Sequence, residues 1–118
     1  MTLLNEKIIL VTGGSTGIGR ATSEILAREG ATVIIGDIQD KEGEETVAAI
    51  IKAGGAAEYY HMDVVNFEQV DHVITDIVSR YGSLDGAHNN AGVEGPASKV
   101  LDYPADEWDR VTRVNLTG

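Results

Sequence analysis

The sequence predicts an α/β domain with a parallel sheet, and three observations support that fold class. Short aliphatic, β-branched runs alternate with segments whose apolar residues recur at helical spacing. A glycine-rich turn over residues 12–19 joins the first such run to the first helical segment. The hydrophobic share is 42% while aromatic residues make up only 5%, which favours this class over a β-sandwich. Because each strand is followed by a helix, the strands should run parallel with right-handed crossovers.

The elements are expected in strict alternation. In chain order they cover residues 7–12, 18–29, 32–36, 41–53, 57–62, 66–81 and 84–89, followed by a loop over 91–103 and a helix that begins at Pro104. The strand segments are short and mostly apolar, as in a buried parallel sheet. Glycines follow each of the first three helices and should end them.

Apolar spacing predicts which helical residues face the core. In the helix over 41–53, Val47, Ile50 and Ile51 should point inward. The helix over 66–81 should begin at Asn66, with Gln69 completing a capping box. Its apolar stripe is the longest in the chain and comprises Val70, Val73, Ile74, Ile77, Val78 and Tyr81.

The glycine-rich turn carries the first functional signal. A turn between a strand and a helix directs free backbone N–H groups and the positive end of the helix at one point, which favours a phosphate or pyrophosphate. No Lys-Ser or Lys-Thr pair follows the glycines, so a phosphate-loop NTPase is excluded. A purely structural turn is the alternative.

Composition limits the remaining classes. The 118 residues suffice for one domain, and the net charge of −10 argues against nucleic acid and anionic membranes as partners. The chain has no cysteine, and its three histidines show no metal-site spacing, so no metal is expected. Nothing in the sequence resembles a signal peptide or membrane span, and we expect a cytoplasmic protein.

The turn reads T-G-x-x-x-G-x-G, and an N-N-A-G motif follows at residues 89–92. In both motifs the chain resembles the short-chain dehydrogenase/reductase family. The resemblance implies a Rossmann-type, doubly wound parallel sheet of strand order 3-2-1-4, covering residues 1–118 as the first half of a dinucleotide-binding domain. It also implies that the turn binds the cofactor through Gly13, Ser15, Thr16, Gly17, Ile18 and Gly19.

Asp37 and its surroundings predict the cofactor. Dinucleotide-binding folds place an acid about 20 residues beyond the turn, where it accepts hydrogen bonds from the adenosine ribose. A carboxylate repels the extra phosphate of NADP, and Ile38, Ser15 and Thr16 are neutral. The sequence therefore predicts NAD as the cofactor. A helix cap or a solvated loop acid is the alternative for Asp37.

Further cofactor contacts follow from the resemblance. Asp63 and Val64 would contact the adenine, although Asp63 could instead cap the next helix. Asn90, Ala91 and Gly92 would line the cofactor, the last two through backbone atoms next to a ribose. Either asparagine of the N-N-A-G motif could be purely structural.

Asn115 is the one residue of the predicted catalytic centre. Asparagine is unfavourable inside a helix, and in the family an asparagine here kinks the helix and holds a water that relays protons to the catalytic lysine. An exposed helix residue is the alternative. The family's catalytic Ser and Tyr-x-x-x-Lys are absent, because no tyrosine has a lysine four positions later.

Two functions remain open. The chain is expected to be the NAD-binding half of an oxidoreductase that transfers hydride between nicotinamide and a small alcohol or carbonyl substrate. In that case residues 1–118 alone should be inactive. The alternative is a stand-alone NAD(H)-binding or interaction module without catalysis. The family resemblance also implies a homo-oligomer, and an open edge at residues 84–89 should promote self-association or disorder after about Gly92.

Two side chains are expected to be structural. His88 stands where the family usually has an aliphatic residue, and we expect it to be hydrogen-bonded within the fold. Trp108 is expected to anchor the last helix by packing.

Overall fold

The computed structural model describes residues 2–118 and contains one four-stranded parallel sheet of order β3–β2–β1–β4. The strand order confirms the prediction. The strands are β1 (Ile8–Thr12), β2 (Thr32–Asp37), β3 (Ala56–His61) and β4 (Gly86–Asn89). The helices are α1 (Gly17–Arg28), α2 (Asp40–Lys52), α3 (Phe67–Tyr81) and α4 (Ala105–Thr112), with a 3-10 turn η1 (Val100–Asp102) and a π-helical turn η2 (Arg113–Thr117).

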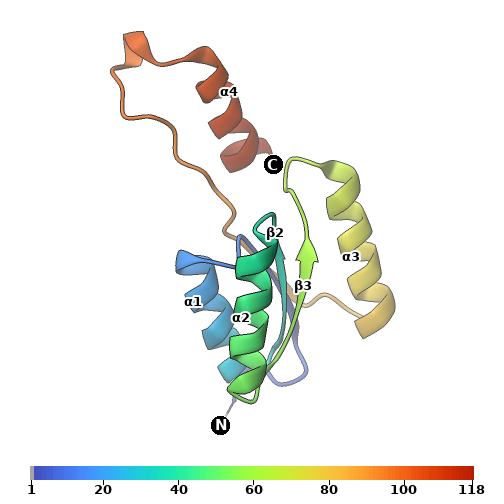
Figure 1. Cartoon of the computed structure of the whole chain (residues 1–118). Coiled ribbons are helices and arrows are strands. Elements are labelled where there is room, and N and C mark those ends of the chain that lie inside the picture. Colours follow the sequence, from blue (N-terminus) through green and yellow to red (C-terminus); the bar gives the residue numbers. More distant parts are fainter. Residues whose placement is uncertain (1) are drawn as a thin grey trace.

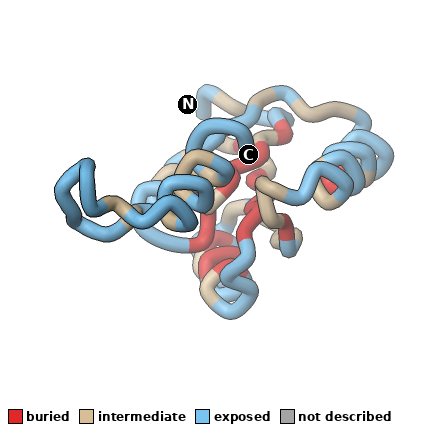
Figure 2. The backbone as a smooth tube through the Cα atoms, turned by 90° about the horizontal axis from the view of Figure 1, so that it is seen from above, coloured by how far each residue is buried: buried red, intermediate tan, exposed pale blue. Residues whose placement is uncertain are grey.

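The sheet is the middle layer of three, with α1 and α2 on one face and α3 on the other (Figure 1). Alternation along the strands divides the core accordingly. Val33 and Ile35 of β2 pack toward α1 and α2, whereas Ile34 packs toward α3, and all three are fully buried. Buried residues gather on the strands and on the helix faces that cover them (Figure 2).

Three inward-facing predictions and one strand boundary are wrong in detail. Ile74 and Val78 of the predicted α3 stripe are 37% and 44% exposed. Ile51 is 57% exposed, because it lies beside the buried Ile50 at the edge of the α2 stripe. The fourth strand begins at Gly86 and not at residue 84. The carboxylate of Asp85 accepts the N–H of Ile8 at 2.8 Å, so a side chain replaces the backbone acceptor there.

The start of α3 follows the predicted capping residue. Asn66 accepts the N–H of Gln69 at 3.1 Å, as an N-cap should. The expected reciprocal bond of a capping box is not formed, because the Gln69 side chain accepts the N–H of Asp63 instead, at 2.9 Å. Gln69 therefore links α3 to the end of the preceding connection.

A polar network joins the edge strand β3 to α3. Tyr60 donates to Asp76, Tyr81 donates to Glu58 at 2.5 Å, and Arg80 binds both Glu58 and Tyr60. Burial and then the bond to Glu58 raise the pKa of Tyr81 to about 12. Burial, followed by the bond to Asp76, also raises the pKa of Tyr60.

This network predicts loss of stability at alkaline pH. The two tyrosines release protons near pH 10.0 when unfolded but at higher pH when folded, so their contribution is complete below pH 10.0 and is lost as the pH rises through their folded pKa values, about 12 for Tyr81. The slope is at most about 1.4 kcal/mol per pH unit for each tyrosine. Melting temperatures between pH 9 and 12 test this, and Glu58→Gln should weaken the dependence. A melting temperature unchanged across that range would contradict it.

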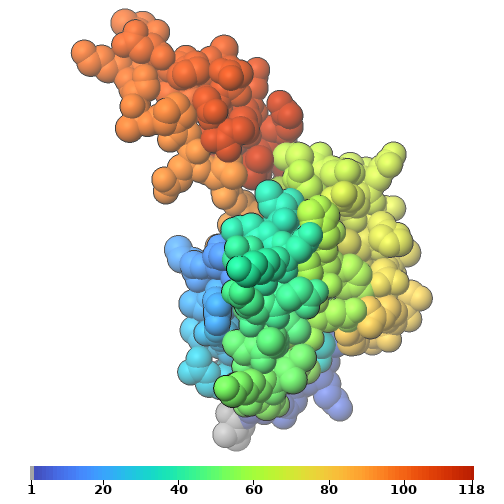
Figure 3. Space-filling view, viewed as in Figure 1, coloured from blue at the N-terminus to red at the C-terminus, as the bar shows by residue number. Residues whose placement is uncertain are grey.

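Beyond β4 the chain leaves the sheet as an arm over residues 93–118, which projects from the body (Figures 1 and 3). None of the residues in η1, α4 or η2 is buried. Trp108 packs edge-on against Tyr103 at 6.4 Å between ring centroids but stays 63% exposed, so its anchoring role is smaller than expected. Among the described residues, no helix is long and apolar enough to cross a bilayer.

Candidate nucleotide-binding site

A cavity of about 530 Å³ lies at the carboxyl ends of the strands. It is bounded by the glycine-rich turn, the ends of β2, β3 and β4, and the arm. The lining residues are Gly13, Thr16, Gly17, Ile18, Gly36, Asp37, Ile38, Gln39, Met62, Asp63, Val64, Asn90, Ala91, Gly92, Val93, Glu94 and Val114. The carboxyl edge of a parallel sheet, where the strand order reverses, is the general ligand site of such folds.

The glycine-rich turn brings the start of α1 to this cavity. Gly13 and Gly17 have φ angles of +63° and +56°, which other residues rarely adopt. A Cβ on Gly17 would meet no atom within 4 Å, so this position opens toward the cavity. The N-cap residue Thr16 makes no side-chain capping bond, which leaves the first N–H groups of α1 available to an anion.

Asp37 lies at the rim of the cavity and also holds the local backbone together. It is 7% exposed. One carboxylate oxygen accepts the N–H groups of Ile38 and Gln39, at 2.7 and 3.3 Å, and the other accepts the N–H of Ser15 at 3.2 Å. A carboxylate has about four acceptor positions, so Asp37 can still accept a hydroxyl of a ligand.

Thr12 joins the two main motifs beneath the cavity. Its hydroxyl oxygen accepts the N–H groups of Asn90 and Ala91, each at 3.0 Å, and Thr12 is only 5% exposed. The Asn90 side chain donates to the carbonyl of Gly13 at 3.2 Å. The N-N-A-G segment is therefore held against the glycine-rich turn, and Ala91 and Gly92 are left to line the cavity.

Two predicted residues of the turn do not line the cavity. Ser15 is 1% exposed, and its hydroxyl oxygen is buried without a hydrogen-bond partner in the described part of the chain. Its carbonyl accepts the Thr46 hydroxyl of α2 at 2.9 Å. Gly19 is buried against Gly13 and Asn90, where it allows the close approach of α1. Both residues support the turn from below.

Asp63 and Val64 line the cavity at the end of β3. One oxygen of the Asp63 carboxylate accepts the N–H of Val65 at 3.1 Å, and its own N–H is held by Gln69. Asn66, and not Asp63, caps α3. His88 is exposed, and its side chain makes no hydrogen bond with the described residues, which differs from the expected side-chain bond.

Asn115 lies in η2 and does not line the cavity. Its side chain accepts the N–H of Val93 and donates to the carbonyl of Val93, both at 2.8 Å. This pair of bonds joins the end of the arm to its start. Because Val93 and Val114 both line the cavity, Asn115 shapes the cavity wall through Val93. The π-helical turn supplies the predicted departure from α-helix.

Several lining residues are not predicted from the sequence, chiefly Gln39, Val93, Glu94 and Val114. Gln39 donates to the hydroxyl of Thr16 at 3.4 Å and so spans the corner between the glycine-rich turn and α2. The sequence feature that could have identified Gln39 as a lining residue is its position two residues after Asp37. No sequence feature identifies Glu94 and Val114 as lining residues, because the path of the arm decides their position.

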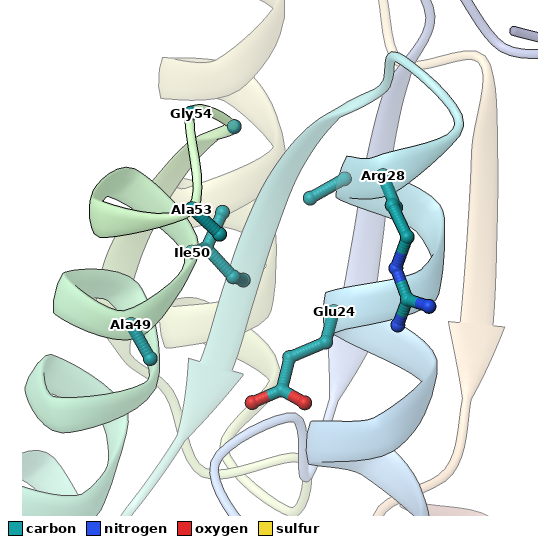
Figure 4. A pocket seen from close by; sticks show the side chains of 8 residues that line it. Glu24, Arg28, Ala49, Ile50, Ala53 and Gly54 are labelled. Atoms are coloured by element: carbon teal, nitrogen blue, oxygen red, sulfur yellow. The ribbon is translucent and has the colours of Figure 1, made fainter.

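A second hollow of about 480 Å³ lies on the α1–α2 face (Figure 4). Its walls are Glu24 and Arg28 of α1, facing Ala49, Ile50 and Ala53 of α2, with Gly54 above. Its lining is mostly small and apolar, apart from Arg28 and the Glu24 carboxylate, which is ion-paired with Arg20 at 2.9 Å. This hollow is remote from the glycine-rich turn, and the free N–H groups of that turn do not line it.

A parallel sheet of this order with a glycine-rich turn after β1 defines a Rossmann-type α/β protein. The chain belongs to the short chain dehydrogenase family, whose model matches residues 7–118. It is 47% identical over 118 residues to an uncharacterized oxidoreductase (YxbG) of Bacillus subtilis, covering all of this chain and 43% of that protein. It is 41% identical to a 3beta-hydroxysteroid dehydrogenase of Mediterraneibacter gnavus, covering 98% and 42% of the two chains.

Solved structures agree with this family. An NAD+-bound xylitol dehydrogenase superposes with a TM-score of 0.93 at 36% identity, over 97% of this chain and 44% of its own. A short chain dehydrogenase from Mycobacterium smegmatis gives 0.92 at 40% identity, over 99% and 49%. The chain thus spans less than half the length of these relatives.

Proposed function

We propose that residues 1–118 form the NAD(H)-binding first half of a dinucleotide-binding domain. The observation that carries the proposal is the Asp37 carboxylate in the lining of the same cavity as the uncapped start of α1. The turn N–H groups would hold the pyrophosphate, and Asp37 would accept the adenosine ribose hydroxyls. Asp63 and Val64 would contact the adenine, and Ala91 and Gly92 would adjoin the second ribose. The xylitol dehydrogenase neighbour, described as NAD+-bound, supports this assignment.

The proposed reaction is hydride transfer between a small alcohol or carbonyl compound and the cofactor. When bound, the nicotinamide supplies the hydride chemistry. This chain supplies binding and orientation, and Asn115 holds the cavity wall through Val93. Residues 1–118 contain no tyrosine with a lysine four positions later, so we propose that they bind the cofactor without turnover. A cytoplasmic location and self-association also remain proposals.

A change of one charge tests the cofactor assignment. Asp37→Asn removes the negative charge and keeps one oxygen, which can still accept the Ile38 and Gln39 N–H groups, while the bond from the Ser15 N–H is lost. The unmodified chain should bind NAD at least about tenfold more tightly than NADP, and Asp37→Asn should narrow that ratio about tenfold, equivalent to about 1.4 kcal/mol. Isothermal titration with both nucleotides measures the two ratios.

Asp71→Asn is the matched control, because it changes the net charge equally at an exposed position of α3. This variant should keep the preference for NAD. Equal affinity of the unmodified chain for NAD and NADP would contradict the role of Asp37, and the absence of saturable binding of either nucleotide would refute the proposed function.

A further inference from the structure

We propose that Tyr59 and His61 of β3 are positioning residues, which hold the turn over residues 37–40, and with it the Asp37 carboxylate, in place for the ribose. The inference rests on the proposed function, because that function assigns the ribose to Asp37. Neither Tyr59 nor His61 lines the cavity, so both would act on the nucleotide only through this turn.

The contacts meet at Asp40, the first residue of α2. The Tyr59 hydroxyl lies 2.7 Å from the Asp37 carbonyl oxygen and 2.5 Å from Oδ1 of Asp40. Nδ1 of His61 lies 2.7 Å from the same Asp40 oxygen. The Asp37 carbonyl also accepts the Met62 N–H at 2.8 Å. The end of β2 and the start of α2 are thus tied to β3 on both sides of the turn.

The Tyr59 ring is held against α2. A Cβ on Gly43 would overlap the ring, so α2 approaches β3 closely only because residue 43 is glycine. The ring also packs on the core between the sheet and α2. Tyr59 is therefore a rigid support, and its hydroxyl fixes Asp40 relative to Asp37.

The turn is also joined to the glycine-rich turn. Asp37 accepts the Ser15 N–H, and Thr46 of α2 donates to the Ser15 carbonyl at 2.9 Å. Asp37, Ile38 and Gln39 all line the cavity, so a shift of α2 would move three lining residues together. This geometry predicts that loosening the Tyr59 contact changes nucleotide selection without removing any atom from the cavity.

The charge state of Asp40 reports the same contacts. The hydrogen bond from Tyr59, and after it the bond from His61, lowers the pKa of the Asp40 carboxyl below its ordinary value of 3.8. The contribution of these bonds is present above pH 3.8 and is lost as the pH falls through the folded value. Asp37 and Glu44 are the other carboxylates that act on Tyr59.

The test compares Tyr59→Phe with Tyr60→Phe in the 118-residue chain. Tyr60 is the matched control, because it lies next in the same strand but bonds to Asp76 and Arg80 on the α3 face. In Tyr59→Phe, the Kd for NAD should rise about five- to tenfold and the preference over NADP should narrow. Tyr60→Phe should leave both unchanged. His61→Ala changes an exposed side chain. It should also raise the Kd for NAD and narrow the preference over NADP, but by less than Tyr59→Phe.

Two readouts do not need the nucleotide. Hydrogen exchange of the Ser15, Ile38 and Gln39 amides, which donate to Asp37, should accelerate more in Tyr59→Phe than in Tyr60→Phe. A carboxyl NMR titration should show the Asp40 pKa returning toward 3.8 in Tyr59→Phe.

The outcomes separate the two hypotheses. If the unmodified chain binds NAD and the two tyrosine variants change its Kd equally, the positioning role is overturned while the proposed function stands. If the unmodified chain binds no NAD, the proposed function fails. The amide exchange then decides whether Tyr59 holds the Asp37 turn, and equal exchange in both variants overturns that role.

Discussion

Gly19→Ala is expected to weaken nucleotide binding at least tenfold and to lower the free energy of unfolding by about 3 kcal/mol. A Cβ at this position would overlap the Gly13 carbonyl oxygen and lie 2.6 Å from Nδ2 of Asn90. Both atoms belong to the bond that joins the glycine-rich turn to the N-N-A-G segment. The turn must therefore move away from α1, and the N–H groups that would hold the pyrophosphate move with it.

Chemical denaturation and NAD titration measure these two effects. Gly86→Ala is the matched control, because the nearest atom to its new Cβ, Cγ1 of Ile9, lies at an ordinary contact distance of 3.8 Å. That variant should change both quantities little. A Gly19→Ala protein as stable as Gly86→Ala would contradict the close approach described for this turn.

Thr12→Val is expected to cost about 1 to 3 kcal/mol of unfolding free energy, because the partly buried N–H of Ala91 loses its acceptor and that of Asn90 keeps only the His88 carbonyl. The hydroxyl oxygen of Thr12 accepts the N–H groups of Asn90 and Ala91, and valine has nearly the same shape without that oxygen. Loosening of residues 90–92 should also weaken NAD binding, since these residues line the cavity.

Thr12→Ser separates the hydroxyl from the side-chain shape. Serine keeps the acceptor and loses one methyl group, so its cost should be clearly smaller than that of valine. Urea denaturation compares the three proteins, and amide exchange at Asn90 and Ala91 locates the change. If serine were the more damaging replacement, packing and not hydrogen bonding would hold this contact.

The sequence alone was sufficient for the class of fold and for the place of the cavity. Hydrophobic periodicity depends on neighbours along the chain, so the alternation of strands and helices could be predicted within a few residues. The carboxyl ends of parallel strands share one edge, so Asp37, Asp63 and Asn90 could be expected together from their positions after strands. The strand order was predicted from the resemblance to a family, which the glycine-rich turn and the N-N-A-G segment carry.

Only the tertiary structure decided which way individual side chains face and what they contact. Ser15 belongs to the predicted turn but is buried beneath it, whereas the unpredicted Gln39 lines the cavity. Asn115 bonds to Val93, which is 22 positions earlier in the chain. The roles of Tyr59 and His61 depend on the packing of α2 against β3. Such contacts join residues far apart in sequence, and no local pattern encodes them, because their geometry exists only once the helices have packed on the sheet.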